Sequence, residues 1–169
     1  MVNKPDEQPG GSAATARLIG DLEAARSDLF GLLSSVAPAG MTAPGLLGEW
    51  SGRELIAHLG YWVGNAVEVI HAVEDGHADE VGEGRPPTDE VNETVARVSR
   101  QTDLATVRKR EVASVEVLLE RLRRMDPSLL QVRLPDGATL ERGIREDGPD
   151  HYREHAEQLR RALEGGGHA

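Results

Sequence analysis

Residues 51–70 read SGRELIAHLGYWVGNAVEVI, and this stretch decides the class of fold. Ser51 followed by Glu54 fits the capping-box pattern, in which a serine caps the first turn of a helix and a glutamate caps the serine in return. Apolar residues then recur three or four positions apart, which places them on one helix face. These apolar residues are Leu55, Leu59, Trp62, Ala66 and then Val69 or Ile70. We expect the helix to end near Gly76.

The same apolar spacing recurs in three other segments. It predicts a first helix over about 13–37, a third helical region from Thr88 or Asp89 to residue 125, and a last helix over at least 150–163. Residues 101–103 leave open whether the third region is one helix or is kinked. Four helices with apolar stripes predict an all-α fold, a four-helix bundle. The stripes are Leu18, Leu22, Ala25, Leu29, Leu32 and Val36; Val91, Val95 and Val98 with Val112, Val115, Leu119 and Leu122; and Leu140, Ile144, Asp147, His151, His155, Leu159 and Ala162.

The remaining segments set the domain limits. Residues 1–12 are rich in Pro, Gly and charge and are expected to form a disordered arm, and residues 165–169 a flexible tail, so residues 13–164 form one bundle. Pro135-Asp136-Gly137 signals a turn, so residues 129–140 form a short hairpin or an irregular loop before the last helix. Gly148-Pro149 would kink the last helix if that helix begins near Thr139.

The composition excludes several kinds of site. The 169 residues include no cysteine, which excludes disulfides, thiolate zinc sites and a cysteine nucleophile. The formal net charge of −10 argues against a nucleic-acid binder, which usually carries a basic patch. The sequence shows no apolar stretch of signal-peptide type and no run near the roughly 20 apolar residues of a membrane span. We therefore expect a cytoplasmic protein with small-molecule substrates and with neither nucleic acid nor membrane as a partner.

Three histidines stand where the helical spacing would place apolar residues. His58 lies in the stripe of the second helix, and His151 and His155 lie four apart on that of the last, hence on one face. Taken singly, His58 could be a hydrogen-bonded core residue and the pair could be solvated. Together they predict a metal site in the bundle core, with a position left open for water or substrate as in catalytic sites. Imidazole suits Zn²⁺, Ni²⁺, Cu²⁺ or Fe²⁺, and the sequence does not choose among them.

The same segment also matches H-x-x-E-H, the inverted zinc-protease signature. In proteases with that signature, a third metal ligand, a carboxylate, lies well downstream. Only 14 residues follow His155 here (169 − 155), so we expect Glu154 to be a solvated carboxylate rather than a protease base. The other three histidines are not expected to be ligands, since His71 points to the opposite side of its helix and the other two lie in polar segments with glycine. These two are His77 and His168.

Few aromatic side chains are available to line a pocket. Trp50 precedes the second helix, Tyr61 and Trp62 adjoin the turn of His58, and Tyr152 adjoins His151. They could form an apolar wall around a pocket, but we favour ordinary packing near the helix ends.

GEWSGRELIAHLGYW (residues 48–62) followed by DHYREHAEQLRRAL (residues 150–163) resembles the DinB-like (YfiT-like) superfamily of metal-dependent enzymes. Members are four-helix bundles with one histidine on a capped second helix, preceded by a tryptophan, and an H-x-x-x-H pair on the last helix. The matching positions here are Trp50, Ser51, His58, His151 and His155. The related mycothiol-dependent maleylpyruvate isomerase N-terminal fold has a carboxylate where His151 stands, which argues against isomerase activity.

The resemblance implies a divalent metal, commonly zinc, nickel or iron, on the three histidines plus water. It favours an enzyme, a transferase that joins a low-molecular-weight thiol such as mycothiol or bacillithiol to a small electrophilic compound. A metal-dependent hydrolase of the same fold and a non-enzymatic, stress-related metal-binding or small-molecule-binding bundle remain alternatives. Dimers are common in the superfamily, so a homodimer stays open. Asp147 is the candidate for orienting His151, and Arg153, otherwise a solvated side chain, for meeting a substrate carboxylate.

Overall fold

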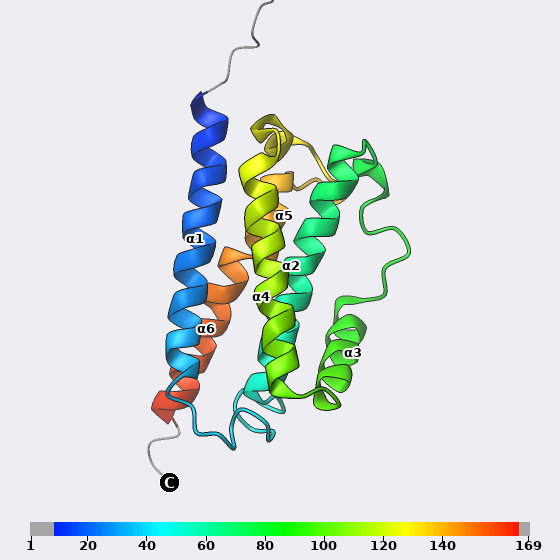
Figure 1. Cartoon of the computed structure of the whole chain (residues 1–169). Coiled ribbons are helices and arrows are strands. Elements are labelled where there is room, and N and C mark those ends of the chain that lie inside the picture. The colour runs from blue at the N-terminus through cyan, green and yellow to red at the C-terminus, as the bar shows by residue number, and fades with distance from the viewer. Residues whose placement is uncertain (1–8, 166–169) are drawn as a thin grey trace, which may run out of the picture.

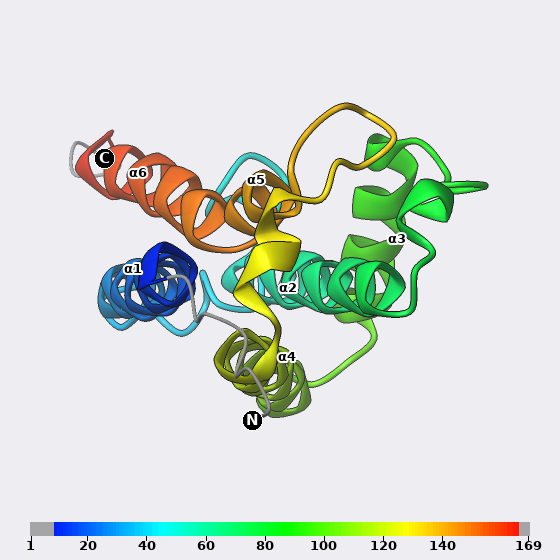
Figure 2. The ribbon, with the colours of Figure 1, turned by 90° about the horizontal axis from the view of Figure 1, so that it is seen from above.

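The computed structural model describes residues 9–165, and its α-helices form the expected bundle. Four legs run side by side: α1, α2, α4, and the broken leg α5–α6, with α3 outside them against α2 (Figures 1 and 2). The prediction of an all-α four-helix bundle is confirmed. The helices are α1 (Pro9–Leu33), α2 (Gly52–Glu74), α3 (Thr88–Arg100), α4 (Leu104–Arg124), α5 (Leu140–Asp147) and α6 (Pro149–Gly165), with short 3-10 helices η1 (Ala78–Glu80) and η2 (Pro127–Gln131).

Helix α2 begins as its sequence predicts. The Ser51 hydroxyl accepts a hydrogen bond from the Glu54 backbone N–H at 3.4 Å, and the Glu54 carboxylate accepts one from the Ser51 N–H at 2.8 Å, so the capping box is complete. Arg100 of α3 donates to the same carboxylate at 2.6 Å. The start of α2 is therefore tied to the end of α3. The helix ends at Glu74, and Gly76 follows it with a φ of 83°.

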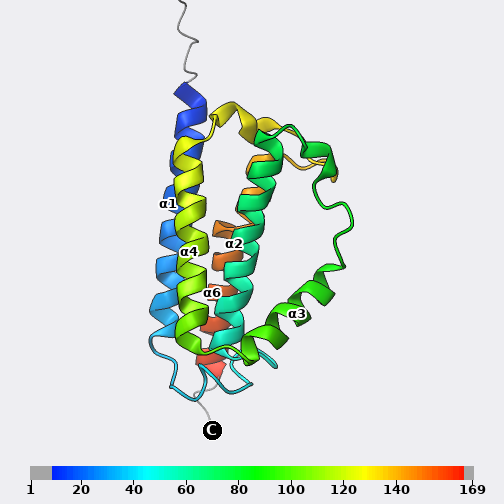
Figure 3. The same cartoon turned by 45° about the vertical axis from the view of Figure 1, so that its right-hand side comes forward.

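The third helical region is two helices. Asp103 caps α4, because its carboxylate accepts hydrogen bonds from the Thr106 backbone N–H at 2.8 Å and from the Thr106 hydroxyl at 2.7 Å. The chain turns at residues 101–103, so α3 leaves the direction of α4 and packs on the outer side of α2 (Figure 3). Val91 and Ala96 of α3 are buried. Exposed Val98 shows that only part of the predicted stripe of α3 is buried.

The last leg is also broken, at Gly148-Pro149. The Gly148 N–H still donates to the Ile144 carbonyl at 3.0 Å, but a Cβ at this position would lie 2.8 Å from that carbonyl oxygen. Glycine therefore permits the break, and proline starts the next helix, where its missing N–H costs nothing. Before α5 the chain forms η2 and one isolated bridge between Arg133 and Thr139, as expected of a short irregular or hairpin segment.

Both ends of α1 lie about one turn earlier than the apolar pattern suggested. The helix begins at Pro9, inside the segment expected to be an arm, and ends at Leu33 rather than near residue 37. Proline suits a first helical position, and the hydroxyls of Ser34 and Ser35 donate to the carbonyls of Gly31 and Leu32, which closes the helix early. Residues 1–8 of the expected arm and residues 166–169 of the expected tail lie outside the described part of the chain.

One buried ion pair crosses the apolar core. Glu111 of α4 is 1% exposed, receives two hydrogen bonds of 2.7 Å from Arg26 of α1, and accepts a third of 2.5 Å from the Tyr152 hydroxyl of α6. On its other side α4 approaches α2 closely, since a Cβ on Gly60 would lie 3.0 Å from the Glu111 Cα. Glu111 thus lies between α2 and α6, and Tyr152 belongs to the core.

No helix within residues 9–165 is both long and apolar enough to cross a membrane.

Candidate metal centre

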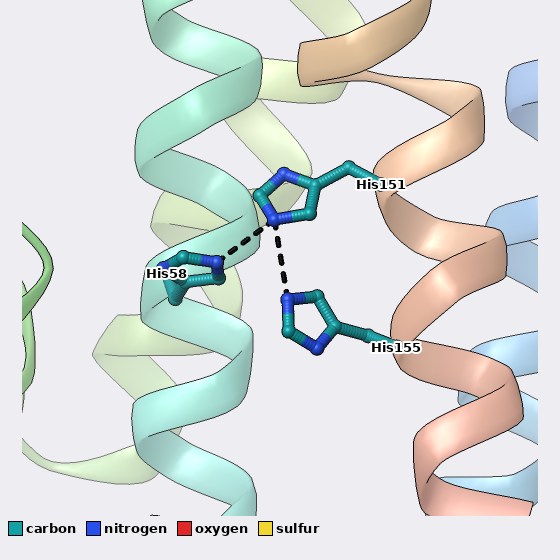
Figure 4. Close-up of side chains that lie close together, drawn as sticks. All are labelled: His58, His151 and His155. Carbon is teal, nitrogen blue, oxygen red and sulfur yellow. Dashed lines mark hydrogen bonds between the residues drawn. The ribbon is translucent and has the colours of Figure 1, made fainter. Parts of the chain in front are cut away.

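The bundle brings His58 of α2 to His151 and His155 of α6 (Figure 4). The Nε2 atom of His151 lies 2.8 Å from that of His58 and 3.1 Å from that of His155, and one ring nitrogen from each residue falls within 4.8 Å of the others. Among the described residues this is the one group of three histidine or acidic side chains found close enough to share an ion. The sequence therefore predicted which three histidines meet.

Two of the three separations between the nitrogen atoms suit a transition-metal ion. Two metal–nitrogen bonds of about 2.0–2.1 Å place their nitrogens roughly 3 Å apart at bond angles between about 90° and tetrahedral. The observed separations of 2.8 and 3.1 Å fall near that value. Without an ion, the Nε2 atom of His151 faces two other Nε2 atoms, and a single N–H there can point at only one of them. A cation bound by three lone pairs removes that conflict, so the donor set fits a divalent metal.

Burial keeps the three imidazoles neutral. Burial, together with the nearby His151 and His155, lowers the pKa of His58 to about 3, although the Asn92 side chain acts the other way. Burial likewise lowers the pKa of His151 to about 4, with His155 contributing, and lowers the pKa of His155. Neutral imidazole is the form that binds metals, so near pH 7 the three rings are in the protonation state that metal binding requires.

Surrounding groups orient the rings unequally. The Nδ1 atom of His155 lies 2.9 Å from Gln158 Oε1, to which it can donate, and this leaves the Nε2 lone pair facing the other histidines. The Nδ1 atoms of His58 and His151 are buried and make no hydrogen bond in the structure. The Trp50 ring packs on His58, with ring centroids 4.8 Å apart, so this side of the site is apolar.

The open side of the cluster is a cavity of about 430 Å³ between α2, α3 and the α5–α6 leg. Its walls combine aromatic rings with polar side chains, a mixture typical of small-molecule sites. Trp62 forms part of the wall and donates a hydrogen bond of 3.0 Å from its Nε1 to Asn92 Oδ1. The lining residues are Trp50, His58, Trp62, Thr88, Asn92, Glu146, Asp147, His151, Glu154 and His155.

Asp147 lies in this cavity, held from α2. Its Oδ2 accepts a hydrogen bond of 2.5 Å from Asn65 Nδ2, and Arg85 donates in turn to Asn65 Oδ1. Burial raises the pKa of Asp147 to about 6, although the Asn65 hydrogen bond lowers it. No hydrogen bond joins the Asp147 carboxylate to His151 in the structure. That Asp147 orients His151 therefore stays a prediction, and the carboxylate of Asp147 lies in the wall of the cavity.

The other candidates from the sequence lie elsewhere. Arg153 pairs with Asp21 at 3.0 Å and Asp150 at 2.9 Å and does not line the cavity, so the solvated interpretation holds. Glu154 is exposed at the cavity edge and accepts a hydrogen bond of 3.2 Å from Gln158. The two remaining described histidines, His71 and His77, are exposed and lie outside the cluster, and His168 lies outside the described residues.

Sequence reasoning missed Asn65, Thr88 and Asn92. Asn65 interrupts the apolar face of α2 three residues after Trp62, which was a usable signal. Thr88 and Asn92 reach the cavity only because α3 turns away from α4, a feature that the sequence left open.

An all-α bundle with one histidine on its second long helix opposite a histidine pair on its last belongs to the DinB-like class, as the motifs implied. Over residues 22–146 the sequence matches the family described as mycothiol maleylpyruvate isomerase N-terminal domain, and the chain belongs to that family. The matched range includes His58 but ends before His151 and His155. The histidine pair is therefore supported by geometry rather than by the family match.

A solved structure has the same fold. The crystal structure of an uncharacterised protein from Escherichia coli UTI89 superposes with a TM-score of 0.75, covering 90% of this chain and 94% of that chain at 15% sequence identity. This likeness supports the bundle and carries no activity with it. No curated protein matches the sequence.

Proposed function

We propose that this protein is a metal-dependent enzyme that joins a low-molecular-weight thiol to a small electrophilic compound. The observation that carries the proposal is the convergence of three neutral imidazoles on one point, with a cavity of about 430 Å³ on the open side. His58, His151 and His155 would hold a zinc, nickel or iron ion. Such an ion lowers the pKa of a thiol or a water molecule that it coordinates.

The thiol has to come from outside the chain. The sequence contains no cysteine, so no side chain can provide a sulfur nucleophile. The description of the family names mycothiol, which makes that thiol the first candidate. The tryptophan rings and the Asn92 amide that line the cavity can hold a compound of this kind through apolar contacts and hydrogen bonds.

Asp147 is the residue that we assign to proton transfer. Its carboxylate lines the cavity, and Asn65 fixes its orientation. In the proposed reaction the thiol gives its S–H proton to the Asp147 carboxylate. The sulfur forms a bond to an electrophilic carbon, and the leaving group departs with the electron pair of the bond that breaks.

The same carboxylate makes hydrolysis the second candidate. A water molecule in the place of the thiol would give its proton to Asp147, and its oxygen would attack an ester or amide carbonyl. The two reactions differ in product: only thiol transfer leaves a carbon–sulfur bond, which mass spectrometry detects.

Elemental analysis of the untagged protein tests the proposal first. We expect about one transition-metal ion per chain, lost in both His58→Ala and His155→Ala and retained in His71→Ala, the matched control on the exposed side of α2. The loaded parent is then incubated with mycothiol and 1-chloro-2,4-dinitrobenzene, and the thioether is quantified beside the Asp147→Asn variant. Equal metal content in the parent and the three histidine variants would contradict the ligand assignment. Metal without thioether formation would contradict thiol transfer.

A further inference from the structure

The charges around the cavity are of one sign. Glu146, Asp147 and Glu154 line it, and none of the lining residues is a lysine or an arginine. Asp147 precedes His151 by one helical turn, and Glu154 directly precedes His155 in the chain. Along the α5–α6 leg, two of the carboxylates therefore precede His151, and the third lies between His151 and His155 in the sequence.

The neighbouring cations offset only part of this charge. Arg153 pairs with Asp21 and Asp150 and does not line the cavity. Arg85 donates to Asn65, lies over the Trp62 ring at 5.9 Å from its centre, and favours the charged form of the Asp147 carboxylate. Arg142 pairs with Glu146 at 2.7 Å, but both side chains are more than half exposed, so solvent screens the pair. For Glu154 the structure shows a hydrogen bond from Gln158, which is uncharged.

From this distribution we infer that the cavity takes small molecules that carry a positive charge, such as a protonated amine, and disfavours carboxylates and dicarboxylates. This inference rests on the proposed function, because it describes the compounds that reach the three histidines. An ion on the three histidines attracts every anion, but Glu146, Asp147 and Glu154 repel a carboxylate and attract an ammonium group, so they shift the preference toward cationic compounds. Arg153, the residue that the sequence suggested for a substrate carboxylate, is held outside the cavity by its two aspartate partners.

The test uses three thiols of similar size and different charge. Cysteamine is cationic, 2-mercaptoethanol is neutral and 3-mercaptopropionate is anionic. Each is titrated into the Co²⁺-loaded protein, and the dissociation constant is read from the sulfur-to-cobalt absorption band. The thiols differ in their own acidity, so the informative quantity is the ratio of the anionic to the cationic dissociation constant, compared between protein variants.

We expect this ratio to fall about tenfold in Glu146→Gln/Glu154→Gln, which removes two exposed charges and keeps the side-chain size. Glu157→Gln is the matched control, because Glu157 is an exposed carboxylate of α6 that pairs with Arg161 and does not line the cavity. The control should leave the ratio unchanged. An unchanged ratio in the double variant, or an equal fall in the control, would overturn the inference.

A second pair of ligands separates this inference from the thiol proposal. Histamine and imidazole-4-acetate bring a nitrogen donor instead of sulfur, with opposite charges. If no thiol binds, thiol transfer fails. The ratio of the dissociation constant of imidazole-4-acetate to that of histamine then still tests the charge preference, by the same tenfold criterion in the same variants. If thiols bind but neither ratio changes, the charge preference fails while the thiol proposal stands.

Discussion

The metal-free protein should lose stability in mild acid because burial lowers the pKa of its three clustered histidines. The folded-state pKa is about 3 for His58 and about 4 for His151, against 6.5 in an unfolded chain. Below about pH 6.5 the unfolded chain takes up protons that the folded chain does not. The free energy of unfolding therefore falls as the pH drops from about 6.5 toward these lower values.

The size of the loss follows from the width of that pH interval. One pKa unit corresponds to about 1.4 kcal/mol, and an unfolded histidine is already half protonated at pH 6.5, so His58 and His151 should each remove about 1.5 kcal/mol between about pH 6.5 and about pH 5. Asp147 acts in the opposite direction, because its folded-state pKa is raised to about 6. Its protonation in the folded state returns about 1 kcal/mol over the same interval. The net loss is then roughly 2 kcal/mol, to which His155 adds in the same direction because its pKa is also lowered.

Urea denaturation followed by circular dichroism measures this loss, with chelator present at both pH values. The variant His58→Gln should show a pH dependence smaller by about 1.5 kcal/mol, since it removes one of the three buried histidines. His77→Gln is the control, because His77 is exposed and lies outside the histidine cluster. Comparison between variants also removes the general effect of titrating a chain with a net charge of −10. The same pH dependence in the parent and in His58→Gln would refute the reasoning.

Three further predictions concern the packing that supports the site, each measured by urea denaturation at pH 7. Gly60→Ala should lower the free energy of unfolding by about 1–3 kcal/mol, because the new Cβ would lie 3.0 Å from the Glu111 Cα. Gly64→Ala is the control: its Cβ would meet nothing closer than 3.7 Å, so the free energy of unfolding should stay the same or rise by up to about 1 kcal/mol. Equal effects of the two would show that α2 and α4 do not approach as described. Tyr152→Phe removes a hydrogen bond to a buried carboxylate and should cost about 1.5–3 kcal/mol; a loss below about 0.5 kcal/mol would count against that bond. Asp103→Ala removes the N-cap of α4 and should cost about 1 kcal/mol, and an unchanged stability would mean that this cap contributes little.

Local signals explain which parts of the fold the sequence predicted. The capping box at Ser51 and the apolar spacing after it involve residues within a few turns of one another, so the start and the buried face of α2 could be derived directly. The break at residues 101–103 was left open because the apolar pattern of either half is compatible with one long helix. Asp103 starts the second of the two helices as its N-cap, but an aspartate within a polar segment does not by itself identify an N-cap.

Contacts between distant residues explain what remained hidden. Glu111 occupies an apolar position between Val107 and Val115, and its partner Arg26 lies 85 residues away in the sequence. No spacing rule connects such a pair. In the site, the three histidines were identified because each replaces an apolar residue within its own helix. The surroundings of Asp147 were not, because Asn65 comes from another helix.

The break between α5 and α6 has a consequence for how the protein is made. His58 and His151 are 93 residues apart, and both histidines of the pair lie beyond Gly148-Pro149 in the final helix. During synthesis the ribosome completes α1, α2 and α4 before the histidine pair exists. Only one of the three imidazoles is then present, and one imidazole cannot hold an ion in a closed set of ligands. In the function proposed above, the closed set of three ligands can therefore form only after α6 has been synthesised and has packed beside α2.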